Sequence, residues 1–178
     1  MSFLERVRAF DDAVDAAVAG RRNPTLDLVA FTLSSVADHS LLWQSAGLVR
    51  EIVGPGDLGR AARFALAMGA ESALTNGPIK AVFARSRPAD FAELEFSSGL
   101  RRPITSSFPS GHAAAAFCAA TLLGGGPGWY ALAAAVASTR VYVRLHYASD
   151  VVGGAALGLA LGAAFRPFVR RSFGTRGE

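Results

Sequence analysis

The 178-residue chain is long enough for one domain, and because 51% of its residues are hydrophobic and only 18% are charged, its composition leans towards a membrane protein. The net charge of +4 is distributed over both ends of the chain instead of forming one basic patch with interleaved aromatic residues, which argues against a nucleic-acid-binding protein. A single cysteine excludes an internal disulfide and a cysteine-rich metal site. We therefore expect residues 1–178 to form a single, largely apolar domain.

Residues 1–22 are predicted to form an amphipathic helix that lies on a membrane interface. Their charged side chains exclude both a membrane-spanning helix and the apolar core of a signal peptide. Apolar side chains recur at helical spacing between residues 3 and 19, namely Phe3, Leu4, Val7, Phe10, Val14 and Val18.

Two further helices and a loop are predicted before the middle of the chain. The break at Asn23-Pro24 precedes a second helix that runs to about residue 49. A turn at residues 54–57 separates it from a third helix over about residues 58–84. Lys80 and Arg87 are spaced about two helical turns apart, which would place them on one face. The stretch from residue 88 to residue 108 is predicted to be a loop.

The second half of the chain is predicted to form three closely packed helices. No Asp, Glu, Lys or Arg occurs from residue 113 to residue 139, a run longer than the ~20 residues that one membrane span needs. Glycines at 124–128 divide this run into two arms, of which the first covers about residues 111–124. The last helix, about residues 149–168, carries Gly154, Gly158 and Gly162 on one face, which predicts close approach of another backbone. The expected fold is an all-α, multi-pass membrane helical bundle.

The distribution of arginines predicts the orientation of this bundle in a cell membrane. Arginines cluster in residues 166–176 and again in residues 50–63, and such clusters favour the cytoplasmic side. The opposite helix ends, which carry the candidate site, would then be extracytoplasmic. Five crossing segments also place the N-terminus outside, whereas Arg6, Arg8, Arg21 and Arg22 favour the inside, so both placements stay open.

Eight residues expected at one depth have the properties of a metal-free phosphoryl-transfer site. Three cations can hold phosphate oxygens, one imidazole can attack phosphorus, a second can protonate the leaving oxygen, and a carboxylate can orient the attacking ring. A glycine at the start of a helix also lets an anion approach the backbone N–H groups. These residues are Lys80, Arg87, Ser110, Gly111, His112, Arg140, His146 and Asp150.

Most of these residues also have an ordinary structural explanation. Ser110 and Gly111 can simply cap a helix, and Lys80 and Arg87 can extend to the membrane interface. A histidine and an aspartate four residues apart are more often structural than catalytic. Arg140 differs, because a cation in an otherwise apolar helix is usually kept for a partner.

The order and spacing of these residues resemble the signature of the type 2 phosphatidic acid phosphatase (PAP2) family, over residues 80–150. Three blocks carry the resemblance: Lys80-x6-Arg87-Pro88, Pro109-Ser110-Gly111-His112 and Arg140-x5-His146-x3-Asp150. The third block departs from the family pattern in one place, because Thr139 stands where the family usually has a serine.

The resemblance implies a role for each residue. His146 would be the nucleophile that forms a phosphohistidine, Asp150 would orient it, and His112 would protonate the leaving group. Neither a metal nor another cofactor is implied. Phosphate would be bound by Lys80, Arg87, Ser110, Gly111 and Arg140.

The predicted function is that of an integral membrane phosphatase whose site opens at the outer leaflet. A shallow site at helix ends meets a headgroup while the lipid tail stays in hydrocarbon. The expected substrates are therefore lipid phosphomonoesters or diphosphates, among them polyprenyl phosphate or diphosphate, phosphatidic acid and phosphatidylglycerol phosphate. Two alternatives are a haloperoxidase-like enzyme whose site holds vanadate, and a non-catalytic membrane scaffold or lipid-binding protein.

Overall fold

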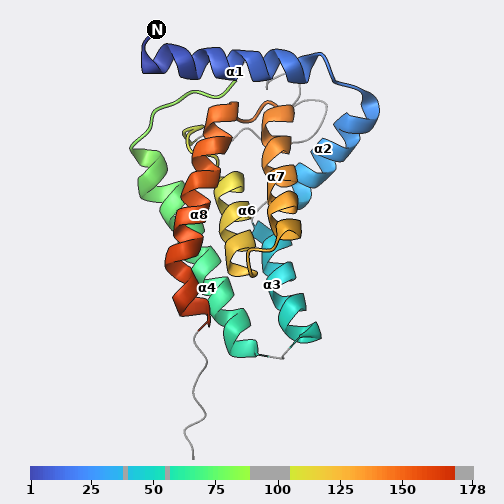
Figure 1. The fold of residues 1–178 in the computed structure, drawn as a ribbon, viewed down its shortest axis with the longest axis vertical. Helices are drawn as coiled ribbons and strands as arrows, with labels where there is room; N and C mark the ends of the chain where they lie inside the picture. The colour runs from blue at the N-terminus through green and yellow to red at the C-terminus, as the bar shows by residue number, and fades with distance from the viewer. Residues whose placement is uncertain (38–39, 55–56, 89–104, 171–178) are drawn as a thin grey trace, which may run out of the picture.

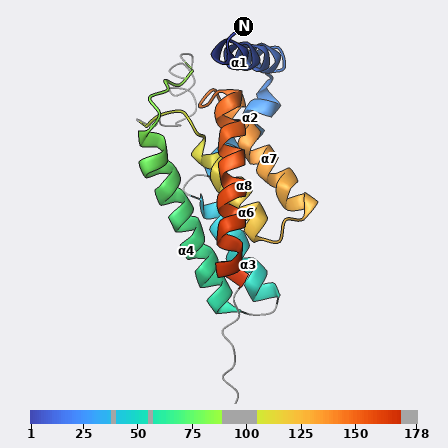
Figure 2. The ribbon, with the colours of Figure 1, turned by 60° about the vertical axis from the view of Figure 1, so that its left-hand side comes forward.

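The computed structural model describes residues 1–37, 40–54, 57–88 and 105–170, and every regular element in these ranges is helical, as predicted. Six α-helices run roughly along one bundle axis, while α1 lies across one end of the bundle (Figures 1 and 2). The elements in chain order are α1 Phe3–Ala19, α2 Pro24–Val36, α3 Leu41–Val53, α4 Leu58–Leu74, the π-helical turn η2 Thr75–Ile79, α6 Gly111–Leu122, α7 Pro127–Tyr142 and α8 Ala148–Arg170.

Helix α1 lies within the predicted residues 1–22, from Phe3 to Ala19, and begins with a reciprocal cap. The Glu5 backbone N–H donates to Ser2 Oγ, and the Ser2 N–H donates to Glu5 Oε2, so two otherwise unpaired donors are satisfied. The side of α1 that faces the bundle contains the half-buried residues Val7, Val14 and Val18. Phe3 and Phe10 remain exposed. The helix is therefore amphipathic as predicted, with part of its apolar surface turned towards the bundle. Its location on a membrane interface stays a prediction.

The second and third predicted helices differ from those in the structure. The expected helix to residue 49 is divided into α2 and α3, and Ser40, just before α3, has a left-handed backbone with a φ of 58°. Such a conformation interrupts a helix. The third helix widens at η2, where Pro78 cannot donate a backbone hydrogen bond and Gly77 leaves helical geometry.

Helical structure ends before residue 83, and the chain continues without regular structure to Pro88. The prediction that Lys80 and Arg87 share a helix face is therefore wrong. Arg87 instead reaches the bundle end on an irregular segment.

The hairpin of α6 and α7 follows the prediction, and α6 is the most deeply buried helix. Positive φ angles of 116° at Gly124 and 70° at Gly125 form the turn before Pro127 starts α7. A side chain at Gly154 or Gly158 would collide with the backbone carbonyl of Ser110 or Ala114. The glycine face of α8 therefore lies directly against α6, which confirms the predicted close packing.

One helix in the described part of the chain, α8, is both long enough and apolar enough to cross a membrane; α2 and α6 are apolar but shorter. At 1.5 Å per residue, a 12-residue helix such as α6 extends only ~18 Å, well short of the hydrocarbon thickness of a bilayer. Large apolar side chains are exposed along the outside of the bundle, including Leu28, Val53, Leu66, Val82 and Val152.

Gly158→Ala is expected to destabilise the protein by about 1–3 kcal/mol, because its new methyl group meets the α6 backbone, which cannot rotate away. Gly69→Ala in α4 is the matched control. No atom lies within 4 Å of its added Cβ, so it should leave stability unchanged or raise it by about 0.5–1 kcal/mol. Thermal unfolding of both variants in one detergent checks this. Equal unfolding temperatures for Gly158→Ala and the unaltered protein would contradict the described contact.

Candidate active site

The candidate residues come from separate segments that meet at the bundle end covered by α1. Lys80 follows η2, Arg87 lies on the irregular segment after it, Ser110 to His112 open α6, and Arg140 lies in the last turn of α7. His146 lies in the loop between α7 and α8, and Asp150 is in the first turn of α8. All are buried except Gly111 and His112, which are half-buried.

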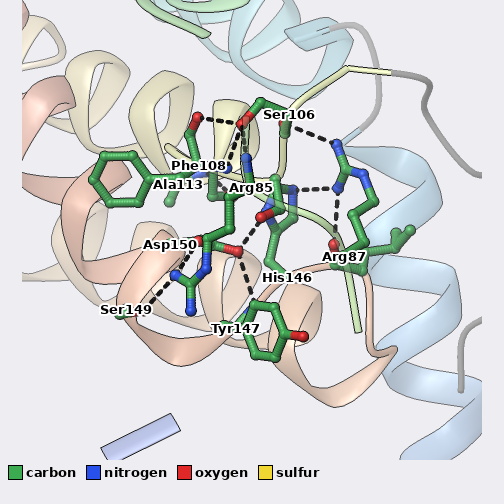
Figure 3. A network of polar contacts seen from close by, with 12 residues as sticks. Arg85, Arg87, Ser106, Phe108, Ala113, His146, Tyr147, Ser149 and Asp150 are labelled. Carbon is green, nitrogen blue, oxygen red and sulfur yellow. Dashed lines mark hydrogen bonds and ion pairs between the residues drawn. The ribbon is translucent and has the colours of Figure 1, made fainter. Parts of the chain in front are cut away.

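His146 has a partner on each side of its ring. Its Nδ1 lies 3.5 Å from Asp150 Oδ2, and its Nε2 lies 3.1 Å from Arg87 Nη1 (Figure 3). An arginine can only donate, so Nε2 carries the lone pair and Nδ1 carries the proton, on the side of the ring that the Asp150 carboxylate occupies. This is the tautomer that a nucleophilic Nε2 requires.

The ring of His146 is neutral at physiological pH. Burial lowers its pKa to about 3; Arg87 and Arg140 act in the same direction, while Asp150 opposes them. A neutral imidazole retains the electron pair with which it can attack phosphorus.

The guanidinium of Arg87 is fixed by several backbone acceptors. It donates to Leu145 O at 2.8 Å and to Thr105 O and Ser106 O at 3.4 Å. A phosphate oxygen held by Arg87 would lie beside Nε2 of His146, because the same Nη1 contacts that nitrogen.

The start of α6 supplies backbone donors next to the loop between α7 and α8 that contains His146. Ser110 is its N-cap, as predicted, with Oγ accepting from Ala113 N at 3.4 Å, and its own N–H donates to Asp150 O at 3.0 Å. An added Cβ on Gly111 would come within 2.9 Å of Asn76 Oδ1 from η2. Glycine at this position therefore permits close approach of Asn76. The neighbouring backbone N–H groups, at a helix N-terminus, favour an anion.

The remaining predicted residues are brought to the same region. Lys80 interacts electrostatically with Arg87, Arg140 and Asp150. Arg140 also hydrogen-bonds to Ser34 Oγ from α2. His112 is the second residue of α6, next to Gly111.

Arg85 and Asp11 belong to the same network, and the sequence analysis did not identify them. Arg85 Nη1 lies 2.6 Å from Asp150 Oδ1, and Arg85 Nη2 lies 2.6 Å from Asp11 Oδ2. One sequence signal for Asp11 exists. At about 100° per residue it falls between Leu4 and Val18 on the apolar side of α1, where an acid needs a buried partner.

Comparison with known proteins places these features in a family. The sequence matches the PAP2 superfamily over residues 60–173. A decaprenylphosphoryl-5-phosphoribose phosphatase from Mycolicibacterium smegmatis is 33% identical over 148 residues, which cover 80% of this chain and 77% of the relative. The corresponding enzyme of Mycobacterium tuberculosis is 32% identical over 157 residues, or 85% and 84% of the two chains.

Two further similarities are more limited. A lipid A 1-phosphatase from Porphyromonas gingivalis is 41% identical over 80 residues, which make up 38% of this chain and 18% of that protein. Among solved structures, the transmembrane PAP2 type phosphatidylglycerolphosphate phosphatase from Bacillus subtilis has the same fold. The TM-score is 0.69 at 24% identity, with 94% of this chain and 89% of that chain covered.

Proposed function

This chain belongs to the PAP2 superfamily, and on that premise we propose that it is an integral membrane lipid phosphatase acting through a phosphohistidine intermediate. The observation that carries the proposal is the arrangement around His146, with Asp150 Oδ2 at 3.5 Å from Nδ1 and Arg87 Nη1 at 3.1 Å from Nε2. An imidazole oriented by a carboxylate and adjacent to a fixed cation can attack a bound phosphate.

In the proposed reaction, the Nε2 electron pair of His146 forms a bond to phosphorus while the bond from phosphorus to the leaving oxygen breaks. His112 gives its proton to that oxygen. Water then attacks phosphorus, the P–N bond breaks, and His112 accepts the proton that the water loses. The carboxylate of Asp150, 3.5 Å from Nδ1, stabilises the ring electrostatically when it becomes positively charged.

Binding of the phosphate group is assigned to three cations and one helix start. Lys80, Arg87 and Arg140 would neutralise its charge, and Ser110 and Gly111 would bring backbone N–H groups to its oxygens. Such fixed donors stabilise the charge that develops on the equatorial oxygens during transfer. We propose that this cage supplies the electrostatic stabilisation without a metal.

The proposed substrate is a lipid phosphomonoester or diphosphate, with polyprenyl compounds first among the candidates. Two relatives with broad coverage are named for a decaprenyl-linked phosphoribose substrate. The proposal treats residues 1–178 as one domain that crosses the membrane several times, with the site at the extracytoplasmic end. The apolar length of α8 and the exposed apolar side chains around the bundle support it.

Purified protein in detergent should release inorganic phosphate from a panel of lipid phosphates, with activity that survives EDTA and is inhibited by vanadate. Vanadate inhibits because it resembles the five-coordinate transition state that the site stabilises. Comparing kcat/KM among decaprenylphosphoryl-5-phosphoribose, polyprenyl diphosphate, phosphatidic acid and phosphatidylglycerol phosphate identifies the preferred class. A loss of activity in EDTA, restored by a divalent cation, would refute the metal-free mechanism. No turnover on any member would favour the scaffold alternative.

A further inference from the structure

Arg85 joins the carboxylate of Asp150 to helix α1 through a network of polar contacts. Its Nη1 contacts Asp150 Oδ1 at 2.6 Å and its Nη2 contacts Asp11 Oδ2 at 2.6 Å. Ser149 completes the set, because its N–H and its hydroxyl both donate to Asp11 at 2.8 Å. Asp11 is only 3% exposed and Asp150 is fully buried, so both carboxylates depend on this cation and on their hydrogen bonds to compensate their charge.

The two oxygens of Asp150 have different partners. Oδ2 accepts from Tyr147 N at 3.0 Å and faces Nδ1 of His146, whereas Oδ1 receives Arg85. Rotation of the carboxylate about its Cβ–Cγ bond would move both oxygens together. The charge-assisted contact at Oδ1 therefore acts together with the Tyr147 N–H at Oδ2 to fix where Oδ2 points, and through Oδ2 the orientation of the histidine.

We propose that Arg85 and Asp11 are positioning residues for the phosphatase reaction, through which α1 holds Asp150 in the orientation that aligns His146. The inference rests on the proposed function, because it concerns the same nucleophile. Neither residue is one of the proposed phosphate-binding groups. In the proposed mechanism the phosphate would meet Nε2, on the side of the ring opposite Asp150.

A cavity beside Arg85 makes this side of the network accessible. It has a volume of about 350 Å³ and is lined by Arg8, Asp11, Asp12, Arg85, Ser86 and Tyr147. Arg85 lies over the Tyr147 ring at 4.4 Å from its centroid. Small cations can therefore reach the position of the guanidinium from solvent, without passing through the phosphate site.

Arg85→Ala should lower kcat by about 10- to 100-fold while changing KM by less than about 2-fold, because the phosphate-binding groups stay in place. Arg85→Lys should retain more activity than Arg85→Ala, since it keeps the charge but cannot contact two carboxylates with two fixed nitrogens. Asp11→Asn should lower kcat less than Arg85→Ala, because its amide oxygen can still accept from Ser149.

The matched control is Asp15→Asn. Asp15 also joins α1 to the loop between α7 and α8, through a 3.4 Å ion pair with Arg144 instead of through Arg85. Its kcat should stay within about 2-fold of the unaltered protein. An equal loss in Asp15→Asn and Asp11→Asn would show that general docking of α1 matters, and would overturn the proposal.

Two readouts separate positioning from a merely structural role. Millimolar guanidinium should raise the kcat of Arg85→Ala several-fold, and should have no such effect on Asp15→Asn.

The acidic limb of kcat/KM should also move to higher pH in Arg85→Ala. His146 must be unprotonated to attack. Removal of Arg85, which pairs with Asp150, leaves the charge of that carboxylate less compensated, so it stabilises the protonated ring more and raises the pKa of His146. The charged groups that face His146 directly are Asp150 of α8, Arg87 of the irregular segment and Arg140 of α7, and none of them is altered.

The outcomes distinguish this inference from the function on which it rests. If the unaltered protein hydrolyses no lipid phosphate, the proposed function fails. If it is active and Arg85→Ala matches it in kcat, or loses activity that guanidinium does not restore, the positioning role fails. If Arg85→Ala does not fold, the comparison of Asp11→Asn with Asp15→Asn decides the question.

Discussion

His146→Ala should reduce phosphate release to the uncatalysed background, a loss of at least about 10³-fold in kcat, because the variant has no group in place to attack phosphorus. The phosphate-binding cations remain, so binding of inorganic vanadate or product should persist. Phosphate release from the preferred lipid, measured beside a mock preparation, checks the result. Unfolding temperatures in the same detergent would show that the variant is folded.

Trapping the intermediate makes this expectation more specific. Brief reaction with a 32P-labelled lipid, followed by denaturation in base, should leave label on the protein that is stable to alkali and lost in mild acid, as expected for a P–N bond. The label should be absent from His146→Ala and located at residue 146 by peptide mapping. Substantial turnover by His146→Ala, or label on another residue, would contradict the nucleophile assignment.

His112→Ala should lose about 10²- to 10⁴-fold in kcat on lipid substrates, because the alkoxide leaving group then departs without a proton. The loss should be much smaller for an aryl phosphate such as p-nitrophenyl phosphate, whose leaving group is stable as an anion. A series of aryl phosphates of graded leaving-group acidity measures this directly. The variant should show a steeper dependence of log kcat on leaving-group pKa than the unaltered protein, provided that formation of the intermediate limits the rate.

Asn76→Ala provides a comparison at the same end of the bundle, because its side chain lies near Gly111 but has no proposed proton-transfer role. It should affect good and poor leaving groups alike. If His112→Ala also lowers kcat by the same factor for every leaving group, the acid assignment is wrong.

The sequence predicted the parts of the fold that depend on local periodicity. The bounds of α1, the hairpin between α6 and α7 and the glycine face of α8 follow from residue spacing within one or two segments. The division between α2 and α3 depends on the backbone at Ser40, which hydropathy does not report. The early end of the third helix had a local signal, since Gly77-Pro78 is a recognised break that the long apolar pattern obscured.

The candidate site, too, could be predicted from the sequence only where spacing along the chain reveals its residues. The family spacing selected His146, Asp150 and Arg87, and the structure places the last two against opposite nitrogens of the imidazole. Arg85 and Asp11 were missed because they join the site through a contact between residues 74 positions apart in the sequence. No pattern along the chain specifies that pairing, although an acid on the apolar side of α1 indicates that it has a buried partner.

The glycine contact between α6 and α8 joins the two helices that carry the proposed acid and the carboxylate of Asp150. Two backbones in direct contact move as one body, so the proposed acid on α6 and the carboxylate on α8 keep a constant relation. Arg87 instead arrives on a chain that has already left its helix. The distances over which protons are transferred are thus set by the packing of α6 against α8, whatever headgroup the substrate carries. Substrate range in such a scaffold can diversify without any redesign of its chemistry.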